Sequence, residues 1–308
     1  MTAALIVAPP SSAAVTCTKY ASLSGNDANP GTDTAPYLTI QHLVDSLSPG
    51  QTGCAHAGTY SATSADHEAA VDFNHGGTAG APVTLTTAPG DPRATLRLRL
   101  QISTGSDYVT VSNLNIDGED NPQKTPEPIV DGDHAILTSN DITNHQRSST
   151  FNTQTGLYVG NICVSVAGAD ALIQFNTIHD CGNKADPDPD GSRNHDHGIY
   201  VTGGTRAQIW NNWIYDNAAR GIQFFPDADA NAVIANVIDG NGEGIVFSGD
   251  AVNTAWASDD NLVARNMVSN SELRYNIYGH WPLSVGNGNV ARDNCVYATA
   301  SGFTAEGG

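Results

Sequence analysis

The apolar residues of this chain recur in short segments in which apolar and polar positions alternate. Six of these segments align on an asparagine that lies two residues before an aliphatic residue. They read TSNDITN (138–144), QFNTIHD (174–180), WNNWIYD (210–216), IANVIDG (234–240), ARNMVSN (264–270) and RDNCVYA (292–298). Alternation over a few residues is typical of β-strands, so this repeat excludes an α-helical solenoid.

A second short apolar segment follows most of these asparagines. These segments are GLYV (156–159), HGIYV (197–201), RGIQFF (220–225), EGIVF (243–247) and GFT (302–304). Strands that recur once per turn, with insertions at particular corners, predict a parallel β-helix whose coils stack about 4.8 Å apart. The aligned asparagines would then point inward at a bend and form a ladder of amide hydrogen bonds.

The segment at residues 20–60 reads YASLSGNDANPGTDTAPYLTIQHLVDSLSPGQTGCAHAGTY. It resembles the opening of pectate-lyase-like proteins, in which a turn, a short amphipathic helix and a Pro-Gly turn precede a Gly-Thr-Tyr strand. Residues 39–47 supply the helix, and its apolar face is formed by Ile40, Leu43, Val44 and Leu47. The resemblance implies an all-β, right-handed parallel β-helix in which this helix caps the N-terminal end of the coil stack.

The N-terminal residues 1–16 are small and apolar and end in an alanine-rich zone. We expect them to be the remainder of a secretory signal peptide, and we expect residues 17–308 to form one β-helix domain of an extracellular protein. The repeat is interrupted at Gly308, so we expect the domain to continue beyond it.

The chain has five cysteines, and their spacing matches no zinc site. Export to an oxidising compartment favours disulfides. Within a β-helix, proximity favours the pairs Cys17 with Cys54 and Cys163 with Cys181. Cys295 is then either a free thiol or has a partner beyond the end of the chain.

The chain is strongly acidic, with 13 Lys and Arg against 32 Asp and Glu and a net charge of −19. Its few basic residues are scattered, which argues against nucleic acid or an anionic membrane as a partner. No run approaches the roughly 18 apolar residues of a membrane span. We expect a monomer.

The insertion at residues 180–200 contains a candidate calcium site. Its Asp-x-Asp-x-Asp-Gly pattern matches the first half of a calcium-binding loop, with Asp186, Asp188 and Asp190 as the candidate ligands. The twelfth position is His197 rather than Glu, which excludes an EF-hand. The alternative interpretation is an acidic turn that proline stiffens.

A cluster of titratable residues follows at the end of this insertion. Strand alternation points Tyr200 outward. One coil later Arg220 aligns with His197 and Gln223 with Tyr200, and a further coil aligns Glu243 with Arg220. Such a cluster in a groove is a candidate active site, although polar corners can also serve only to satisfy turn backbones. The insertion adds Arg193 and His195.

These residue types suit the β-elimination of uronate polysaccharides. That reaction needs a base for the C5 proton, a cation that neutralises the carboxylate and an acid for the leaving oxygen. We predict His197 or Tyr200 as base or acid and Arg220 as the neutralising cation. His195 and Lys184 are further catalytic candidates.

Several side chains are predicted to bind the polymer. Tyr215, Tyr278 and Trp281 are placed to point outward, and sugar rings stack well on aromatic faces. The polar candidates for substrate binding are Arg193, Gln223 and Glu243. An anionic polymer on so acidic a chain requires calcium or an arginine patch to reverse the local field.

The sequence therefore predicts a secreted polysaccharide lyase that acts on an extended uronate-containing glycan. The lysine motif of one pectate-lyase branch and the Asp-Pro-His motif of mannuronan C5-epimerases are both missing. Two alternatives use the same groove. They are a C5-epimerase and a glycoside hydrolase, for which Asp180, Asp196, Asp216 and Glu243 could supply two facing carboxylates. A third alternative is a non-catalytic adhesion protein of the cell surface.

Overall fold

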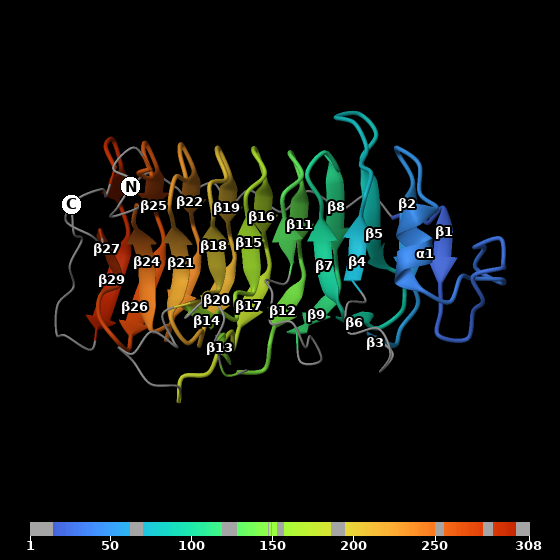
Figure 1. Ribbon diagram of the computed structural model, residues 1–308, viewed down its shortest axis with the longest axis horizontal. Coiled ribbons are helices and arrows are strands. Elements are labelled where there is room, and N and C mark those ends of the chain that lie inside the picture. The colour runs from blue at the N-terminus through green and yellow to red at the C-terminus, as the bar shows by residue number, and fades with distance from the viewer. Residues whose placement is uncertain are drawn as a thin grey trace, which may run out of the picture.

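The computed structural model describes residues 15–61, 70–118, 128–146, 148, 150–152, 157–185, 195–249, 256–279 and 286–299. Three parallel sheets wind around one axis as a right-handed parallel β-helix, which confirms the predicted fold class (Figure 1). Each coil passes from a ten-stranded sheet to a nine-stranded sheet and then to an eight-stranded sheet. No helix in the described part of the chain is long and apolar enough to span a membrane.

The ten-stranded sheet contains β1 (Lys19–Ala21), β2 (Thr52–Ala55), β5 (Val83–Thr87), β8 (Val109–Ser112), β11 (Ile136–Thr138), β16 (Leu172–Gln174), β19 (Gln208–Trp210), β22 (Ala232–Ile234), β25 (Leu262–Ala264) and β28 (Val290–Arg292). The nine-stranded sheet contains β3 (Thr59–Ser61), β6 (Thr95–Arg97), β9 (Asn115–Asp117), β12 (Asp141–Thr143), β17 (Thr177–His179), β20 (Trp213–Tyr215), β23 (Val237–Asp239), β26 (Met267–Ser271) and β29 (Cys295–Thr299). The eight-stranded sheet contains β4 (Ala70–Phe73), β7 (Arg99–Ile102), β10 (Ile129–Val130), β15 (Val164–Val166), β18 (Ile199–Val201), β21 (Arg220–Phe224), β24 (Glu243–Phe247) and β27 (Ile277–Gly279).

The predicted asparagine ladder lies at the corner between the ten-stranded and nine-stranded sheets. From Asn140 to Asn294, each side-chain amide donates to the side-chain oxygen of the next asparagine at 3.0–3.1 Å. That oxygen also accepts the backbone N–H of the asparagine before it. The residue preceding each ladder asparagine has a left-handed backbone, with φ of 55–60°. This conformation costs of order 1 kcal/mol for a non-glycine residue, and the ladder bonds offset that cost.

Two further corners carry asparagine ladders that the repeat alignment did not reveal. Asn231, Asn261 and Asn289 form one where the chain enters the ten-stranded sheet. Asn217 and Asn241 form another between the nine-stranded and eight-stranded sheets. Buried amides therefore fix the bends at all three corners, because each one satisfies backbone groups that the turn leaves unpaired.

The predicted capping helix is present as α1 (Ile40–Asp45), at the end of the stack where β1 lies (Figure 1). The Thr39 hydroxyl caps it by accepting the backbone N–H of His42 at 3.1 Å. Its predicted apolar face is buried in the core, as Ile40, Leu43, Val44 and Leu47 show. The helix thus covers the interior that the first coil would otherwise expose.

Both predicted disulfides are present, Cys17–Cys54 and Cys163–Cys181. Cys295 has an exposed free thiol on β29. The second disulfide joins the approach to β15 with the corner that follows β17. It therefore joins the start of the 180–200 insertion to the preceding coil.

The structure corrects two strand assignments. Residues 157–159 form β14, which pairs antiparallel with β13 (Thr150–Asn152) outside the three large sheets, and β15 takes the expected place in the coil. Residues 277–279, which the repeat alignment did not assign to a strand, form β27 at the end of the eight-stranded sheet. The predicted strand at 302–304 and most of the predicted signal segment lie outside the described residues.

The ladder can be tested with Asn212→Ala. We expect the free energy of unfolding to fall by about 2–4 kcal/mol, because the backbone N–H and the side-chain amide of Asn176 lose their shared acceptor. Denaturant unfolding followed by circular dichroism measures the change. The control is Asn74→Ala at an exposed position, and equal losses in the two variants would contradict the role of the ladder.

Candidate active site

The outward face of the eight-stranded sheet aligns the residues predicted to act together. Tyr200 on β18 lies in register with Gln223 on β21, and Arg220 lies in register with Glu243 on β24. The side chains of Ile199 and Val201 are buried on either side of the half-exposed Tyr200. The predicted alignment of Tyr200 with Gln223 and of Arg220 with Glu243 is therefore confirmed.

A cavity of about 150 Å³ opens on this face of the sheet. Its lining residues are Ile162, His195, His197, Tyr200, Arg220, Gln223 and Phe225. Five of them were candidates from the sequence. The alternation of the strands and the shared register bring them together although they lie on two successive coils.

Both cavity histidines are neutral at physiological pH. Burial lowers the pKa of His197 well below its ordinary value, and the charge of Arg220 acts in the same direction. Burial and Arg220 also lower the pKa of His195. His197 is only 3% exposed, and its Nδ1 has no hydrogen-bond partner among the described residues. A buried ring nitrogen of this kind is a group that a bound ligand would satisfy.

Tyr200 remains protonated under the same conditions. Burial raises the pKa of its hydroxyl to about 12, although the nearby Arg220 charge opposes the shift. The Tyr200 ring lies 5.3 Å from the His197 ring and 6.4 Å from the Phe225 ring, measured between centroids. The cavity therefore holds a proton donor beside two neutral imidazoles.

Two arginines share one buried carboxylate at the edge of the cavity. Arg220 Nε donates to Glu243 Oε2 at 2.9 Å, and Arg274 Nε donates to Glu243 Oε1. Burial raises the pKa of Glu243, but the two arginines outweigh this effect and hold it below its usual value. Two arginines against one carboxylate leave a local excess of positive charge at the edge of the cavity, although the protein as a whole is acidic. Arg220 also donates to Gln223 Oε1 at 3.3 Å, which orients the amide.

Arg274 is a charged residue at the edge of the site that sequence reasoning missed. It lies just before β27, a strand that the repeat alignment did not include, so no register argument pointed to it. Its side chain is 38% exposed while its partner Glu243 is 1% exposed. A ligand at the surface can therefore reach Arg274.

The structure does not bring Lys184 to the cavity. Its ammonium group donates to Asp216 at 2.8 Å, Glu272 at 2.7 Å and the Gly240 carbonyl at 2.7 Å. Burial lowers the pKa of Lys184, but these hydrogen bonds raise it above its ordinary value. Lys184 therefore joins successive corners as a cation and lies away from the cavity that contains the other catalytic candidates.

Two of the predicted aromatic residues point outward but differ in their surroundings. Tyr278 lies in the same outward column as Tyr200 and Gln223, yet it is only 6% exposed and lies against Glu243. Tyr215 lies on the outward side of β20 in the nine-stranded sheet, away from the cavity. The remaining candidates are Arg193, Trp281 and the calcium ligands Asp186, Asp188 and Asp190, and they lie outside the described residues. Within the described ranges no group of three or more His, Cys, Asp or Glu side chains could hold a metal ion.

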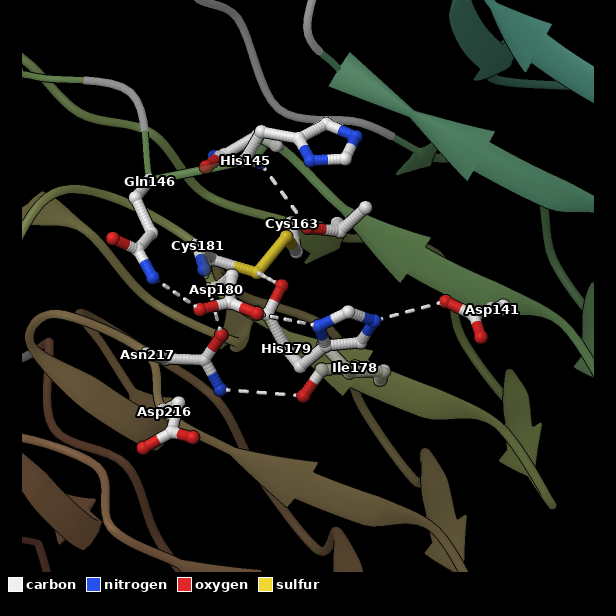
Figure 2. A network of polar contacts seen from close by, with 12 residues as sticks. Asp141, His145, Gln146, Cys163, Ile178, His179, Asp180, Cys181, Asp216 and Asn217 are labelled. Carbon is white, nitrogen blue, oxygen red and sulfur yellow. Dashed lines mark hydrogen bonds and ion pairs between the residues drawn. A yellow bond between two sulfur atoms is a disulfide. The ribbon is translucent and has the colours of Figure 1, made fainter.

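A third histidine, His179 at the end of β17, has a pKa shifted in the opposite direction. Figure 2 shows the His179 ring between two carboxylates, with Nδ1 2.8 Å from Asp180 and Nε2 3.0 Å from Asp141. Burial lowers the pKa of His179, but these two carboxylates raise it above its ordinary value. Gln146 donates to the other Asp180 oxygen at 2.6 Å. The network thus favours the protonated form of the half-buried His179 ring beside the Cys163–Cys181 disulfide.

The fold and the cavity define a right-handed parallel β-helix protein with a polar site on one sheet. The family model described as right handed beta helix region matches residues 100–296, and the chain belongs to this family. Among curated proteins no sequence match was found.

Solved structures share this fold at low sequence identity. XylC in complex with xylose superposes with a TM-score of 0.63 at 12% identity, covering 91% of this chain and 66% of that chain. Alginate lyase from Paenibacillus sp. str. FPU-7 gives a TM-score of 0.52 at 14% identity, covering 85% and 96%. A rhamnogalacturonan lyase gives 0.50 at 16% identity, covering 90% and 74%. At these identities the similarity establishes the fold.

The charge of His179 makes a testable contribution to stability. Because its folded pKa is raised, the stabilisation is fully present below the unfolded pKa of about 6.5 and is lost as pH rises through the folded value. We expect the Tm difference between wild type and His179→Gln to be largest in mild acid and to shrink in alkali. Thermal unfolding across this pH range measures it. His42→Gln, at an exposed helix position, is the control, and a pH-independent difference for His179→Gln would contradict the interpretation.

Proposed function

We propose that this protein is a secreted polysaccharide lyase that cleaves uronate-containing glycans by β-elimination in the cavity of the eight-stranded sheet. The observation that supports this most strongly is the composition of the cavity wall. It combines neutral imidazoles, a protonated phenol and a guanidinium, which are the base, acid and cation of the reaction. Similar folds in an alginate lyase and a rhamnogalacturonan lyase are consistent with this chemistry.

The reaction follows from the charge state of each group. Arg220 pairs with the uronate carboxylate and stabilises the negative charge that develops when the C5 proton leaves. The neutral imidazole of His197 or His195 accepts that proton. The C4–O bond then breaks as the C4–C5 double bond forms, and the Tyr200 hydroxyl gives its proton to the leaving oxygen. Proton return from the imidazolium to the phenolate restores the site.

The carboxylates of the chain favour a lyase over a hydrolase. A glycoside hydrolase needs two carboxyl groups facing the same glycosidic bond, and no Asp or Glu is among the described residues that line the cavity. Glu243 is held by two arginines, and Asp196 accepts the backbone N–H of Asn161 at 2.7 Å. Asp180 and Asp216 pair with His179 and Lys184 at another corner.

Calcium remains part of the proposal as a second source of positive charge. Its candidate ligands are the aspartates of the 186–190 insertion, which lie outside the described residues. The proposed β-elimination uses only side chains that line the described cavity. Chelator treatment in the activity assay separates the contribution of a metal from that of Arg220 and Arg274.

The function is tested by incubating the protein with alginate, pectate, chondroitin and neutral glycans. We expect one uronate polymer to yield an unsaturated product that absorbs in the ultraviolet. Tyr200→Phe should lower kcat by about 10²–10⁴-fold, because the leaving oxygen loses its proton donor. Tyr108→Phe, which stacks on His134 away from the cavity, is the control and should keep its activity.

Each other result of that assay contradicts a stated part of the proposal. New reducing ends without ultraviolet absorbance indicate a hydrolase. Deuterium uptake at C5 without chain cleavage indicates an epimerase. Binding without any product indicates an adhesion protein. Full activity of Tyr200→Phe would show that the acid has been assigned to the wrong residue.

The pH profile tests the base separately. The lowered pKa of His195 and His197 keeps the basic form available in mild acid, so the acidic limb of kcat/KM should lie below the ordinary histidine value of about 6.5. Replacement of the responsible histidine by Gln should remove this limb together with most of the rate. A limb at or above 6.5 in the wild type would contradict the assignment of either cavity histidine.

A further inference from the structure

The outward face of the nine-stranded sheet carries an exposed aromatic pair on β20. Trp213 is 52% exposed, and its ring centroid lies 4.4 Å from that of Tyr215 at an angle of 33°. Both residues belong to a strand that contributes nothing to the cavity of the eight-stranded sheet. The fold therefore presents two separate faces on which a ligand could lie.

The aromatic pair is held rigidly from one side. The Tyr215 ring stacks on the His179 ring with centroids 5.0 Å apart and planes only 2° from parallel. Asp180 and Asp141 fix both nitrogens of that imidazole (Figure 2). When the His179 ring is protonated, it adds a cation–π attraction to the Tyr215 face. The platform is thus ordered before any ligand arrives, which lowers the entropic cost of binding.

Carboxylates border this platform. Asp141 and Asp180 lie beside His179, and Asp239 on β23 is in register with Tyr215. Their oxygens are acceptors for hydroxyl groups. The three carboxylates outnumber the single charge of His179, so the surface is negative where the cavity is positive. A uronate chain is repelled here, whereas a neutral sugar offers hydroxyl donors and an apolar ring face.

We propose that Trp213 and Tyr215, with the bordering carboxylates, form a second glycan-binding surface that takes neutral sugar units. Aromatic faces bind the apolar side of a sugar ring, and the carboxylates accept its hydroxyl hydrogens. Val237 and Met267 continue the row of Trp213 on the next two strands and are also exposed, which lengthens the surface along the axis of the coil stack.

Charge argues against a second copy of the chain as the occupant of this surface. An exposed apolar row can also mark a contact between protein molecules. Two copies that met through this row would bring their bordering aspartates together, and each copy carries a net charge of −19. A neutral glycan avoids this repulsion.

The test is calorimetric titration of the whole chain with xylohexaose, mannohexaose and trigalacturonate. We expect a neutral hexasaccharide to bind and the binding to weaken by about tenfold or more in Trp213→Ala and in Tyr215→Ala. Trp256→Ala removes another exposed tryptophan and should bind like the wild type. Tyr200→Phe should also bind normally, because it changes only the cavity. Circular dichroism confirms that each variant is folded.

Three results would overturn this proposal. The first is that neither neutral hexasaccharide binds to the wild type. The second is that the binding is lost in Tyr200→Phe and kept in Trp213→Ala, which would place the ligand in the cavity. The third is that sedimentation shows a dimer that Trp213→Ala dissociates, which would make the row a contact between two copies. Lyase activity is measured separately, so failure of either proposal leaves the other unaffected.

Discussion

The hydrogen bond between successive ladder asparagines is the interaction on which the rest of the structure depends. Ladder asparagines lie 36 residues apart at one step and 24 at another, yet the same amide bond forms at both. The extra residues of a long coil are therefore accommodated outside this corner. A one-residue slip in a strand exchanges its inward and outward faces. Because the ladder fixes the register of every coil, it determines which side chains point into the core and which point to the surface.

The positions of the cavity residues follow from that register. Arg220 and Glu243 are 23 residues apart in sequence but lie in register on neighbouring strands, where a buried ion pair forms. Burying such charges is costly unless each has a good partner, and Arg274 supplies the second donor that Glu243 requires. The result is a local excess of positive charge on a chain of net charge −19. Composition alone would have argued against binding an anionic polymer.

Sequence reasoning succeeded where the repeat determines position. The alternation along β18 and the step to β21 and β24 placed Tyr200, Gln223, Arg220 and Glu243 correctly relative to one another. It failed where an insertion interrupts the repeat. β14 resembles a coil strand in composition, but β15 takes that place, because pattern cannot distinguish two short apolar segments within one long connection. For a related reason, the sequence did not predict Arg274 or the partners of Lys184, because these contacts depend on how loops fold back onto the corners.

His179 and His197 show how a coil stack sets the chemistry of identical side chains. Both are at least partly buried, and burial alone lowers the pKa of an imidazole. Arg220 reinforces this effect at His197, whereas Asp141 and Asp180 reverse it at His179. Some of the decisive neighbours lie on other coils, about one strand spacing away, and would be remote in an unfolded chain. The lowered pKa of His197 in the cavity and the raised pKa of His179 beside Tyr215 are therefore both consequences of register. This is why two faces of one coil stack can differ in local charge.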